Sequence, residues 1–275
     1  MYCSTRLSLF LFTAAVSALP SCTISPAEEK PDSPCICDSQ TYLTGAVLFT
    51  QESAEYKALC LQAYNAAAAR LPELSAKSER PAVVLDLDET VLDNSPYSAW
   101  QVLNGKPYSP ETWVRWVQEA SAEEVPGAGG FLHFADSLGL RIFYISNRDT
   151  SQLPPTMTNM EKLGLPQLRQ ENFLLKTETS DKTERRNAVR AEGYDIVMLI
   201  GDNLGDHSGR YDKPATSAER SQSAFEDAEK FGAEYIVLPN TIYGTWEGTL
   251  YNYDRSISDA ERCRLRREHL AAPEL

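Results

Sequence analysis

Apolar runs of strand length alternate along this 275-residue chain with segments of helical periodicity. The runs at 82–87, 140–146 and 196–200 are rich in aliphatic and aromatic residues and are too apolar for exposed strands. Shorter runs at 172–175 and 235–238 continue the series. Strands separated by helices predict a parallel sheet with helices on both faces, so we expect a doubly wound, Rossmann-like α/β fold.

Helices are expected between these runs. They lie at 53–70, 131–138, 153–163, 183–192, 221–231 and 258–270. Pro72 is expected to end the first helix, and Gly139 and Gly193 to end two others, because proline and glycine disfavour a helix interior. An aromatic-rich stretch at about 95–130 follows the first strand, and we expect it to form a small cap over the site.

Two carboxylates, Asp86 and Asp88, stand at the end of the first strand. Side chains two positions apart share one face of an extended chain, so both can point at one small object. In a doubly wound sheet that object lies outside the carboxyl ends of the strands. Two carboxylates held so close repel each other unless a cation or a shared proton intervenes, and Mg²⁺ is the common cation beside phosphates. The sequence therefore predicts a magnesium site.

Polar residues also follow the other strands. They are Thr90 after the first strand, Ser146, Asn147 and Arg148 after the second, Lys176, Asp181 and Lys182 after the third, and Gly201, Asp202, Asn203 and Asp206 after the fourth. The carboxyl ends of parallel strands meet at one edge of the sheet, so we expect these groups to share one pocket.

Such a set can carry out phosphoryl transfer, which needs a nucleophile, neutralised charge and a proton for the leaving group. Asp86 can attack phosphorus to form an aspartyl-phosphate, and Asp88 can protonate the leaving oxygen and later accept a proton from water. Because Asp88 must be protonated when the leaving group departs, we expect activity to fall as it ionises. Ser146 and a lysine can hold the transferring oxygens.

The remaining polar residues have supporting roles in this interpretation. Asp86 and Asp202, with the backbone carbonyl of Asp88, can hold Mg²⁺. Asp206 is expected to orient the lysine or a water on the metal. Thr90, Asn147 and Arg148 are candidate substrate-binding residues. For Asn147 and Arg148 the alternative is a structural role, in which Arg148 pairs with an acid of the site.

These residues, in this order, resemble the haloacid dehalogenase (HAD) superfamily of phosphohydrolases. The matching motifs are Asp86-Leu87-Asp88-Glu89-Thr90, Ser146 at a strand end, a lysine, and Gly201-Asp202-Asn203 followed by Asp206. The second aspartate is typical of the phosphatases of that superfamily. The stretches 53–58 (SAEYKA), 86–97 (DLDETVLDNSPY) and 238–247 (LPNTIYGTWE) look like the class C acid phosphatases, also called the lipoprotein e (P4) family. The resemblance covers roughly residues 41–246.

The resemblance implies a bacterial, exported, Mg²⁺-dependent acid phosphatase that acts on small phosphomonoesters, including nucleoside monophosphates and nicotinamide mononucleotide. It selects Lys182 over Lys176, which remains the alternative. It also places Trp113 and Tyr243 beside the base or ring of the substrate. For both aromatic residues a core or homodimer contact remains the alternative.

Residues 1–22 have the features of a signal peptide, because Arg6 precedes the apolar stretch 7–19. The small residues at 16–18 suit ordinary signal peptidase. Residues 19–22 resemble instead the bacterial lipobox, in which Cys22 becomes the lipidated first residue, although Pro20 departs from the pattern. We expect an outer membrane lipoprotein, with a soluble periplasmic or secreted protein as the alternative. A flexible tether at 23–40 and a phosphatase domain at 41–275 complete the expected organisation.

Export favours disulfides, and the cysteines of the mature chain are Cys35, Cys37, Cys60 and Cys263. Four thiols allow three pairings, and we expect one or two structural disulfides. The net charge of −13 argues against a nucleic acid polymer or an anionic membrane surface as partner. The expected partner is a small phosphomonoester, and contact with a membrane is expected only through a lipid on Cys22.

Two other functions stay open. The chain could be a surface lipoprotein that mainly binds a partner and carries a vestigial site, or a phosphotransferase that passes the phosphoryl group to an alcohol. The intact set Asp86, Asp88, Lys182 and Asp202 argues against a vestigial site.

Overall fold

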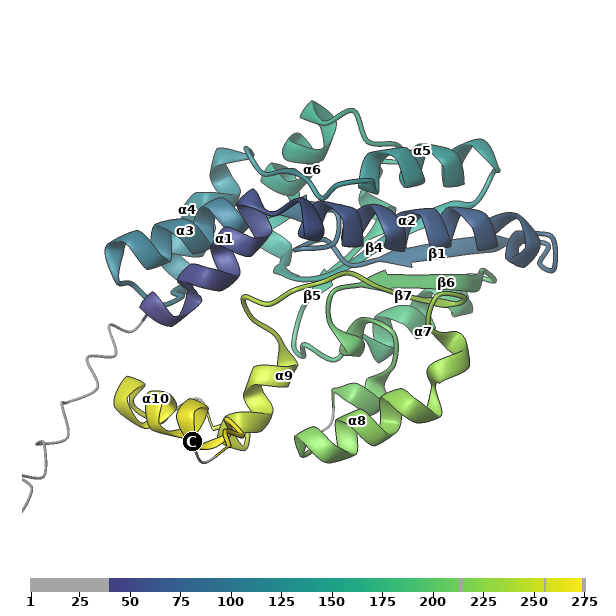
Figure 1. Ribbon diagram of the computed structural model, residues 1–275. Helices are drawn as coiled ribbons and strands as arrows, with labels where there is room; N and C mark the ends of the chain where they lie inside the picture. Colours follow the sequence, from purple (N-terminus) through teal and green to yellow (C-terminus); the bar gives the residue numbers. More distant parts are fainter. Residues whose placement is uncertain (1–39, 213–214, 255, 274–275) are drawn as a thin grey trace, which may run out of the picture. The chain divides into compact units, whose positions relative to one another are not determined.

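A five-stranded parallel sheet lies between two layers of helices in the computed structural model (Figure 1). The structure describes residues 40–212, 215–254 and 256–273, all within the unit Ile36–Leu275. Outside the described residues lie the predicted signal peptide (1–22), the predicted lipidation site Cys22, the predicted tether up to residue 39, and Cys35 and Cys37.

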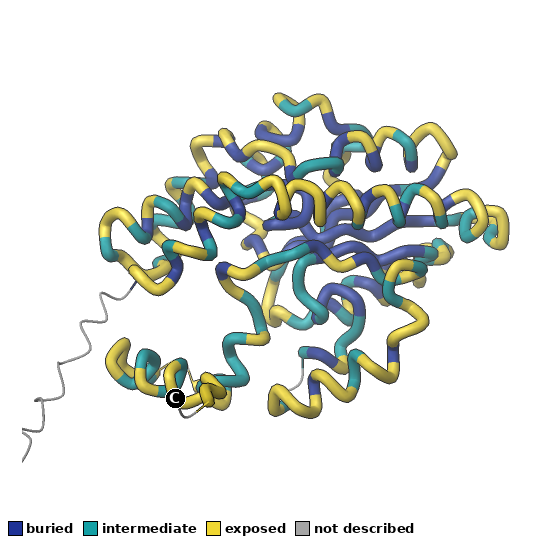
Figure 2. Tube along the Cα trace, in the orientation of Figure 1, coloured by how far each residue is buried: buried dark blue, intermediate teal, exposed yellow. Residues whose placement is uncertain are grey.

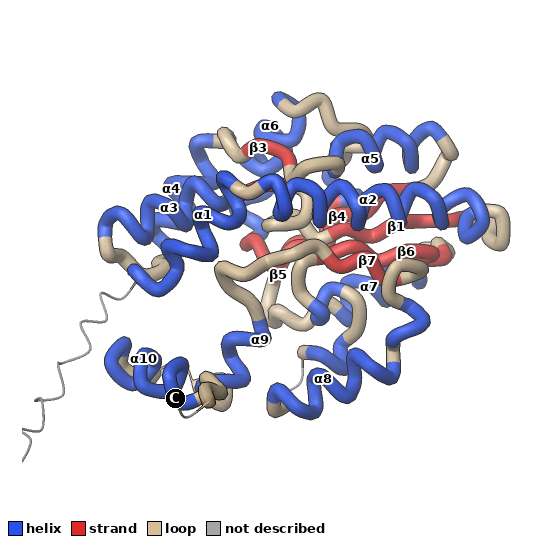
Figure 3. The backbone as a smooth tube through the Cα atoms, in the orientation of Figure 1, coloured by secondary structure: helices blue, strands red, loops and turns tan. Residues whose placement is uncertain are grey.

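The order of the strands places β1 at the centre of the sheet. In space the strands are β5 (Phe173–Lys176), β4 (Arg141–Asp149), β1 (Pro81–Leu85), β6 (Asp195–Gly201) and β7 (Tyr235–Val237). Leu85 pairs with Tyr144 on one side and with Ile200 on the other. The chain builds outward from β1 to β5 and then returns past β1 to form β6, so the strand order reverses beside β1. The predicted doubly wound α/β fold is confirmed (Figure 3).

Alternate side chains of β1 enter two separate hydrophobic cores. Val83 and Leu85 pack in the core that also holds the buried faces of α2 and α5, whereas Ala82 and Val84 pack with Val189 of α7. Figure 2 shows the resulting pattern, in which the strands are buried and the outer surfaces of the helices are exposed. The helices of the first layer are α2 (Ala54–Ser75), α5 (Ala128–Ser137) and α6 (Leu153–Lys162), and those of the second are α7 (Thr183–Ala191) and α8 (Ser217–Glu226).

Helix α5 begins at Ala128 rather than at 131, and larger shifts from the predicted boundaries occur at two other helices. Helix α2 continues past Pro72 to Ser75, because the Pro72 carbonyl still accepts a hydrogen bond from Ala76 N at 3.2 Å and closes a last turn. Helix α8 begins at Ser217 rather than at 221, because Thr216 and Glu219 form a capping box there, and it ends at Glu226 rather than at 231. These errors concern local ends and leave the order of elements unchanged.

The region predicted as a cap, at about 95–130, is mainly helical. It contains α3 (Ser95–Asn104) and α4 (Pro110–Glu119), and the two-stranded ribbon of β2 (Leu92–Asp93) and β3 (Glu123–Glu124) joins it to the sheet domain. Tyr97 packs against Trp113 with ring centroids 5.3 Å apart, so the aromatic residues of this region pack largely on one another. The remaining helices are α1 (Thr44–Glu52), which contacts α3, and α9 (Thr245–Gly248) and α10 (Asp259–Glu268) near the end of the chain.

The cysteines that the structure describes reduce the number of possible disulfide pairs. Cys60 is a buried free thiol on α2, and Cys263 is disulfide-bonded. Cys60 therefore leaves the set of candidate pairs, and the pairing among the others stays a prediction. Among the described residues, no helix combines the length and the apolar character that crossing a membrane requires.

Candidate active site

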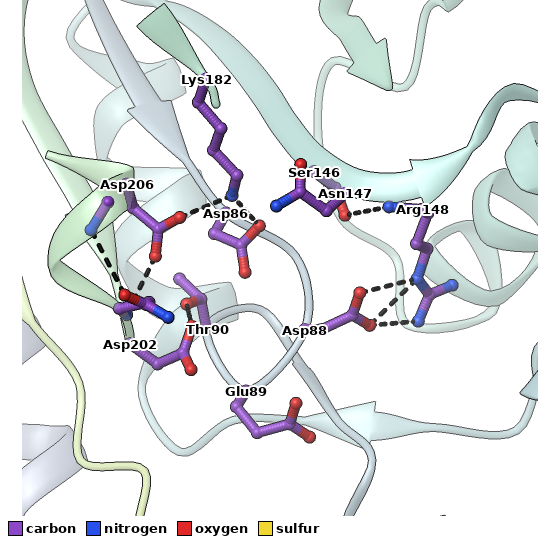
Figure 4. Close-up of polar contacts among 12 residues, drawn as sticks. Asp86, Asp88, Glu89, Thr90, Ser146, Asn147, Arg148, Lys182, Asp202 and Asp206 are labelled. Atoms are coloured by element: carbon purple, nitrogen blue, oxygen red, sulfur yellow. Dashed lines mark hydrogen bonds and ion pairs between the residues drawn. The ribbon is translucent and has the colours of Figure 1, made fainter. Parts of the chain in front are cut away.

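The carboxyl ends of the central strands bring the predicted residues to one edge of the sheet (Figure 4). Asp86 and Asp88 follow β1, and Asp202 follows β6. Ser146, Asn147 and Arg148 lie in the last part of β4, and Lys182 directly precedes α7. Asp86 N donates to Ile200 O at 2.9 Å, so the nucleophile candidate is still held by the sheet ladder.

Lys182 links two of the acidic residues. Its Nζ forms an ion pair with Asp86 Oδ1 and lies 2.7 Å from Asp206 Oδ1. Burial lowers the pKa of Lys182, but the charges of Asp206 and Asp86 outweigh this effect and raise it, so the amine stays protonated. The alternative lysine, Lys176, pairs instead with Asp149 at 3.3 Å. The structure thus places Lys182, and not Lys176, among the candidate catalytic residues.

Three carboxylates lie close enough together to share a cation. Single oxygens of Asp86, Asp202 and Asp206 all lie within 4.8 Å of one another. Burial raises the pKa of Asp86 to about 7, although the charge of Lys182 opposes the rise. Burial, with the charges of Asp206 and Asp86, also raises the pKa of Asp202 well above its usual range. The mutual repulsion of these carboxylates would be relieved by a cation, and their oxygen atoms are the ligands that a divalent metal ion such as Mg²⁺ prefers.

Neighbouring polar groups hold the three carboxylates in place. Asn240 Nδ2 donates to Asp202 Oδ2 at 2.8 Å, and Thr90 Oγ1 donates to Asp202 Oδ1 at 3.5 Å. Asn203 N donates to Asp206 Oδ2 at 3.0 Å. A Cβ at Gly201 would collide with the Asp206 side chain, which explains the glycine of this motif. Thr90, predicted to bind substrate, is fully buried and contacts a carboxylate of the cluster instead.

Asp88 points away from the three-carboxylate cluster and toward Arg148 (Figure 4). Arg148 Nη2 lies 2.7 Å and Nε 3.0 Å from Asp88 Oδ1. Asn94 Nδ2 donates to the same oxygen at 2.9 Å. The side chain of Asp88 is therefore not a ligand of the cluster. Arg148 therefore pairs with an acid of the site, which is the structural role that the sequence offered as the alternative to substrate binding.

Ser146 and Asn147 are held by their own neighbours. Ser146 Oγ accepts a hydrogen bond from Arg148 N at 3.1 Å, which leaves its hydroxyl proton for another acceptor. Arg185 Nη2 donates to Asn147 Oδ1 at 2.7 Å, and Arg185 Nη1 donates to Ser146 O at 2.6 Å. Arg185 was not predicted, although its spacing of three residues from Lys182 at a helix start could have indicated it.

A cleft of about 640 Å³ opens over Asp86, Asp88 and Lys182. An adjoining cavity of about 380 Å³ shares Asp88 and Tyr243 with it. Tyr243 is 41% exposed, and both Tyr243 and Trp113 line the second cavity. These volumes suit a small organic ligand.

Sequence reasoning missed two asparagines that support the site. Asn94, which is 2% exposed, donates to Asp88 and accepts from Trp116 Nε1 at 2.8 Å through its side chain. Asn240 holds Asp202. Both lie inside the motif stretches 86–97 and 238–247, which is the only signal that the sequence offers for them.

Comparison with known proteins identifies the family of the chain. The model of the HAD superfamily, subfamily IIIB (acid phosphatase), matches residues 22–246. The structure of the class C acid phosphatase from Bacillus anthracis matches with a TM-score of 0.82 and 41% identity, covering 86% of this chain and all of that one. Its structure with tungstate bound matches with a TM-score of 0.79 and 40% identity, covering 86% of this chain and 99% of that one.

Curated sequences give shorter matches. Acid phosphatase 1 of Solanum lycopersicum is 28% identical over 135 residues, which cover 47% of this chain and 53% of that protein. The chain thus spans about half the length of the curated relatives that match first.

Proposed function

The chain belongs to the acid phosphatases of the HAD superfamily, subfamily IIIB, and we propose that it is a Mg²⁺-dependent enzyme that hydrolyses small phosphomonoesters through an aspartyl-phosphate. The observation that carries the proposal is Lys182, a buried ammonium between Asp86 and Asp206 at the floor of the cleft. It gives a chain of net charge −13 the local positive charge that a phosphate site needs.

The reaction has two halves in this proposal. Asp86 attacks phosphorus, the ester P–O bond breaks, and the leaving alcohol takes a proton from Asp88. Water then attacks the aspartyl-phosphate and gives a proton to the Asp88 carboxylate, which restores Asp86 and releases inorganic phosphate. Arg148 and Asn94 hold Asp88 in a fixed direction between the two proton transfers.

The phosphoryl oxygens have donors on this chain. Lys182 supplies a fixed charge, and Ser146 has a hydroxyl proton to donate. Arg185 occupies the Asn147 amide oxygen, so the Asn147 NH₂ is available to a phosphoryl oxygen. Asp86 and Asp202, with the backbone carbonyl of Asp88, would hold Mg²⁺, which when bound neutralises charge on the phosphoryl group, and the Asp206 carboxylate lies beside them.

The leaving group would occupy the outer cleft and the adjoining cavity. Trp113 and Tyr243 line that space and suit the ring of a nucleoside monophosphate, nicotinamide mononucleotide included. The related Bacillus anthracis enzyme has been solved with tungstate, a tetrahedral oxyanion like phosphate, which supports an oxyanion site in this chain.

We propose the same organisation and location that the sequence predicts. Residues 1–22 are an export signal, 23–40 a tether, and 41–275 the phosphatase domain, with a cap inserted at about 95–130. The protein is an exported bacterial protein, and a lipid on Cys22 holds it at the outer membrane. Cys22→Ala tests the anchor, because it should move the protein from the membrane fraction to the soluble fraction.

The function is tested by phosphate release from a nucleoside monophosphate by purified protein. The assay is run with Mg²⁺, with EDTA, and with Asp86→Asn. Turnover that needs metal and disappears in folded Asp86→Asn supports the proposal. No turnover of this substrate or of an aryl phosphate by folded, metal-loaded protein would contradict it and favour a binding protein. Added glycerol distinguishes the transferase alternative, which would form glycerol phosphate.

A further inference from the structure

Glu89 is buried directly beside the candidate acid–base Asp88. It is 2% exposed, and its backbone has a φ of 57°, a left-handed conformation that a long side chain rarely adopts. This conformation turns its carboxyl group away from the metal-binding carboxylates (Figure 4). Phosphoryl transfer as proposed above gives Glu89 no task, so its burial in this conformation needs another explanation.

The two carboxyl oxygens of Glu89 bind two different loops. Asn94 N donates to Oε1 at 2.9 Å, and the Tyr243 hydroxyl donates to Oε2. The first contact is local, and Asn94 also holds Asp88 through its side chain. The second contact spans 154 residues of sequence. Glu89 therefore joins the turn that carries Asp88 to the loop that follows β7.

Tyr243 gains a defined position from this contact. Its backbone N donates to Asn240 Oδ1 at 3.3 Å, and Asn240 also holds Asp202. With 41% of its surface exposed, the ring would otherwise be able to change rotamer at the mouth of the cleft. Asn240, which also holds Asp202, thus fixes the backbone of Tyr243. Glu89, next to Asp88, fixes its hydroxyl.

We propose that Glu89 is a positioning residue that holds the ring of Tyr243 as a fixed wall for the leaving group. This inference rests on the proposed function, because it assumes that the cleft binds a phosphomonoester. A substrate whose leaving group carries a planar ring gains contact with the wall. A small aliphatic leaving group gains little, so Glu89 contributes to selection for ring-bearing phosphomonoesters.

The test compares two substrates, a nucleoside monophosphate and glycerol phosphate, with Glu89→Ala, Tyr243→Phe and the double variant. We expect each single variant to raise KM for the nucleoside monophosphate about tenfold, with a much smaller change for glycerol phosphate. The double variant should have a KM no higher than that of either single variant, because each single variant already removes the same hydrogen bond. Glu89→Gln should keep most of the selectivity, since its amide can accept from Asn94 N and donate to the Tyr243 oxygen.

The controls separate positioning from stability. Tyr211 donates to Asp227 at 2.9 Å, so Tyr211→Phe removes a tyrosine–carboxylate bond elsewhere and should leave the substrate preference unchanged. Equal losses on both substrates, or unchanged preference in Tyr243→Phe, would overturn the inference, and Tyr243→Phe decides alone if Glu89→Ala does not fold. Absence of turnover by the wild-type protein on both substrates would contradict the proposed function itself.

Discussion

Arg148 holds the carboxylate of Asp88 through two N–H groups, Nη2 at 2.7 Å and Nε at 3.0 Å from Oδ1. The third nitrogen of the guanidinium, Nη1, donates to Thr156 Oγ1 at 2.8 Å, and Arg148 is only 3% exposed. A planar, fully engaged guanidinium of this kind leaves the carboxylate little freedom to rotate. The direction of the proposed general acid is thus set by a residue from the neighbouring strand.

Replacing Arg148 by Met should therefore reduce kcat by about 100-fold, because Asp88 loses its orientation. KM for a nucleoside monophosphate should change much less. Arg148→Lys keeps the charge but not the paired geometry, so we expect it to restore only part of kcat. Steady-state kinetics on variants with normal thermal melting measure this effect. Wild-type kcat in Arg148→Met would show that Asp88 needs no such partner.

The two candidate lysines give opposite predictions. Lys182→Met removes the fixed cation beside Asp86 and should lower kcat/KM by at least about 100-fold. Lys176→Met breaks only a partly exposed pair with Asp149, so activity should stay within about twofold of wild type. The reverse pattern in a phosphate-release assay would assign the catalytic role to Lys176.

Asn240 gives a prediction about metal affinity rather than chemistry. Its side chain holds Asp202 at 2.8 Å, and loss of such a support typically weakens a metal site by 10- to 100-fold. We expect Asn240→Ala to raise the Mg²⁺ concentration for half-maximal activity by about tenfold, with most of the activity recovered at saturating Mg²⁺. A lower kcat that Mg²⁺ cannot restore would mean that Asn240 acts on the reaction and not on the metal.

The strand-end carboxylates could be predicted from sequence because their signal is local. Asp86 and Asp202 each follow an apolar run, and parallel strands bring such ends together whatever the loops do. The role of Lys182 is harder to predict from sequence than that of Asp86. Lys182 lies in a connection between β5 and α7, and only the path of that connection returns it to the end of β1, while Lys176 stays beside Asp149 on the neighbouring strand.

The supporting contacts could not be predicted because they join distant loops. Arg148 and Asp88 are 60 residues apart in sequence, and Glu89 and Tyr243 are 154 residues apart. Such pairs depend on loop conformations that neither periodicity nor composition specifies. The end of α2 could not be predicted either, although it depends on nearby residues. The sequence around Pro72 does not indicate that the Pro72 carbonyl accepts the hydrogen bond that closes the last turn.

Asp212 makes the stability of the protein depend on pH in a defined direction. Burial raises its pKa to about 6 from an ordinary value of 3.8, and the charge of Asp181 adds to the rise. Its Oδ2 is buried without a hydrogen-bond partner among the described residues. A carboxyl group whose pKa is higher in the folded state binds its proton more tightly there. The ionised carboxylate of Asp212 therefore lowers the free energy of unfolding by its full amount above pH 6. This loss of stability disappears as the pH falls toward 4.

Asp212→Asn should accordingly stabilise the metal-free protein at pH 8. The pKa difference sets an upper limit of about 3 kcal/mol, and partial exposure of the group reduces the expected gain in unfolding free energy to about 1–2 kcal/mol. The gain should shrink as the pH falls through 6 and vanish near pH 4, where the wild-type carboxyl group is neutral in the folded state and largely neutral in the unfolded state. Urea unfolding of both proteins in EDTA at pH 8 and pH 4 measures the two values. An equal gain at both pH values would trace the effect to packing or hydrogen bonding, because only a buried charge on Asp212 predicts a gain confined to high pH.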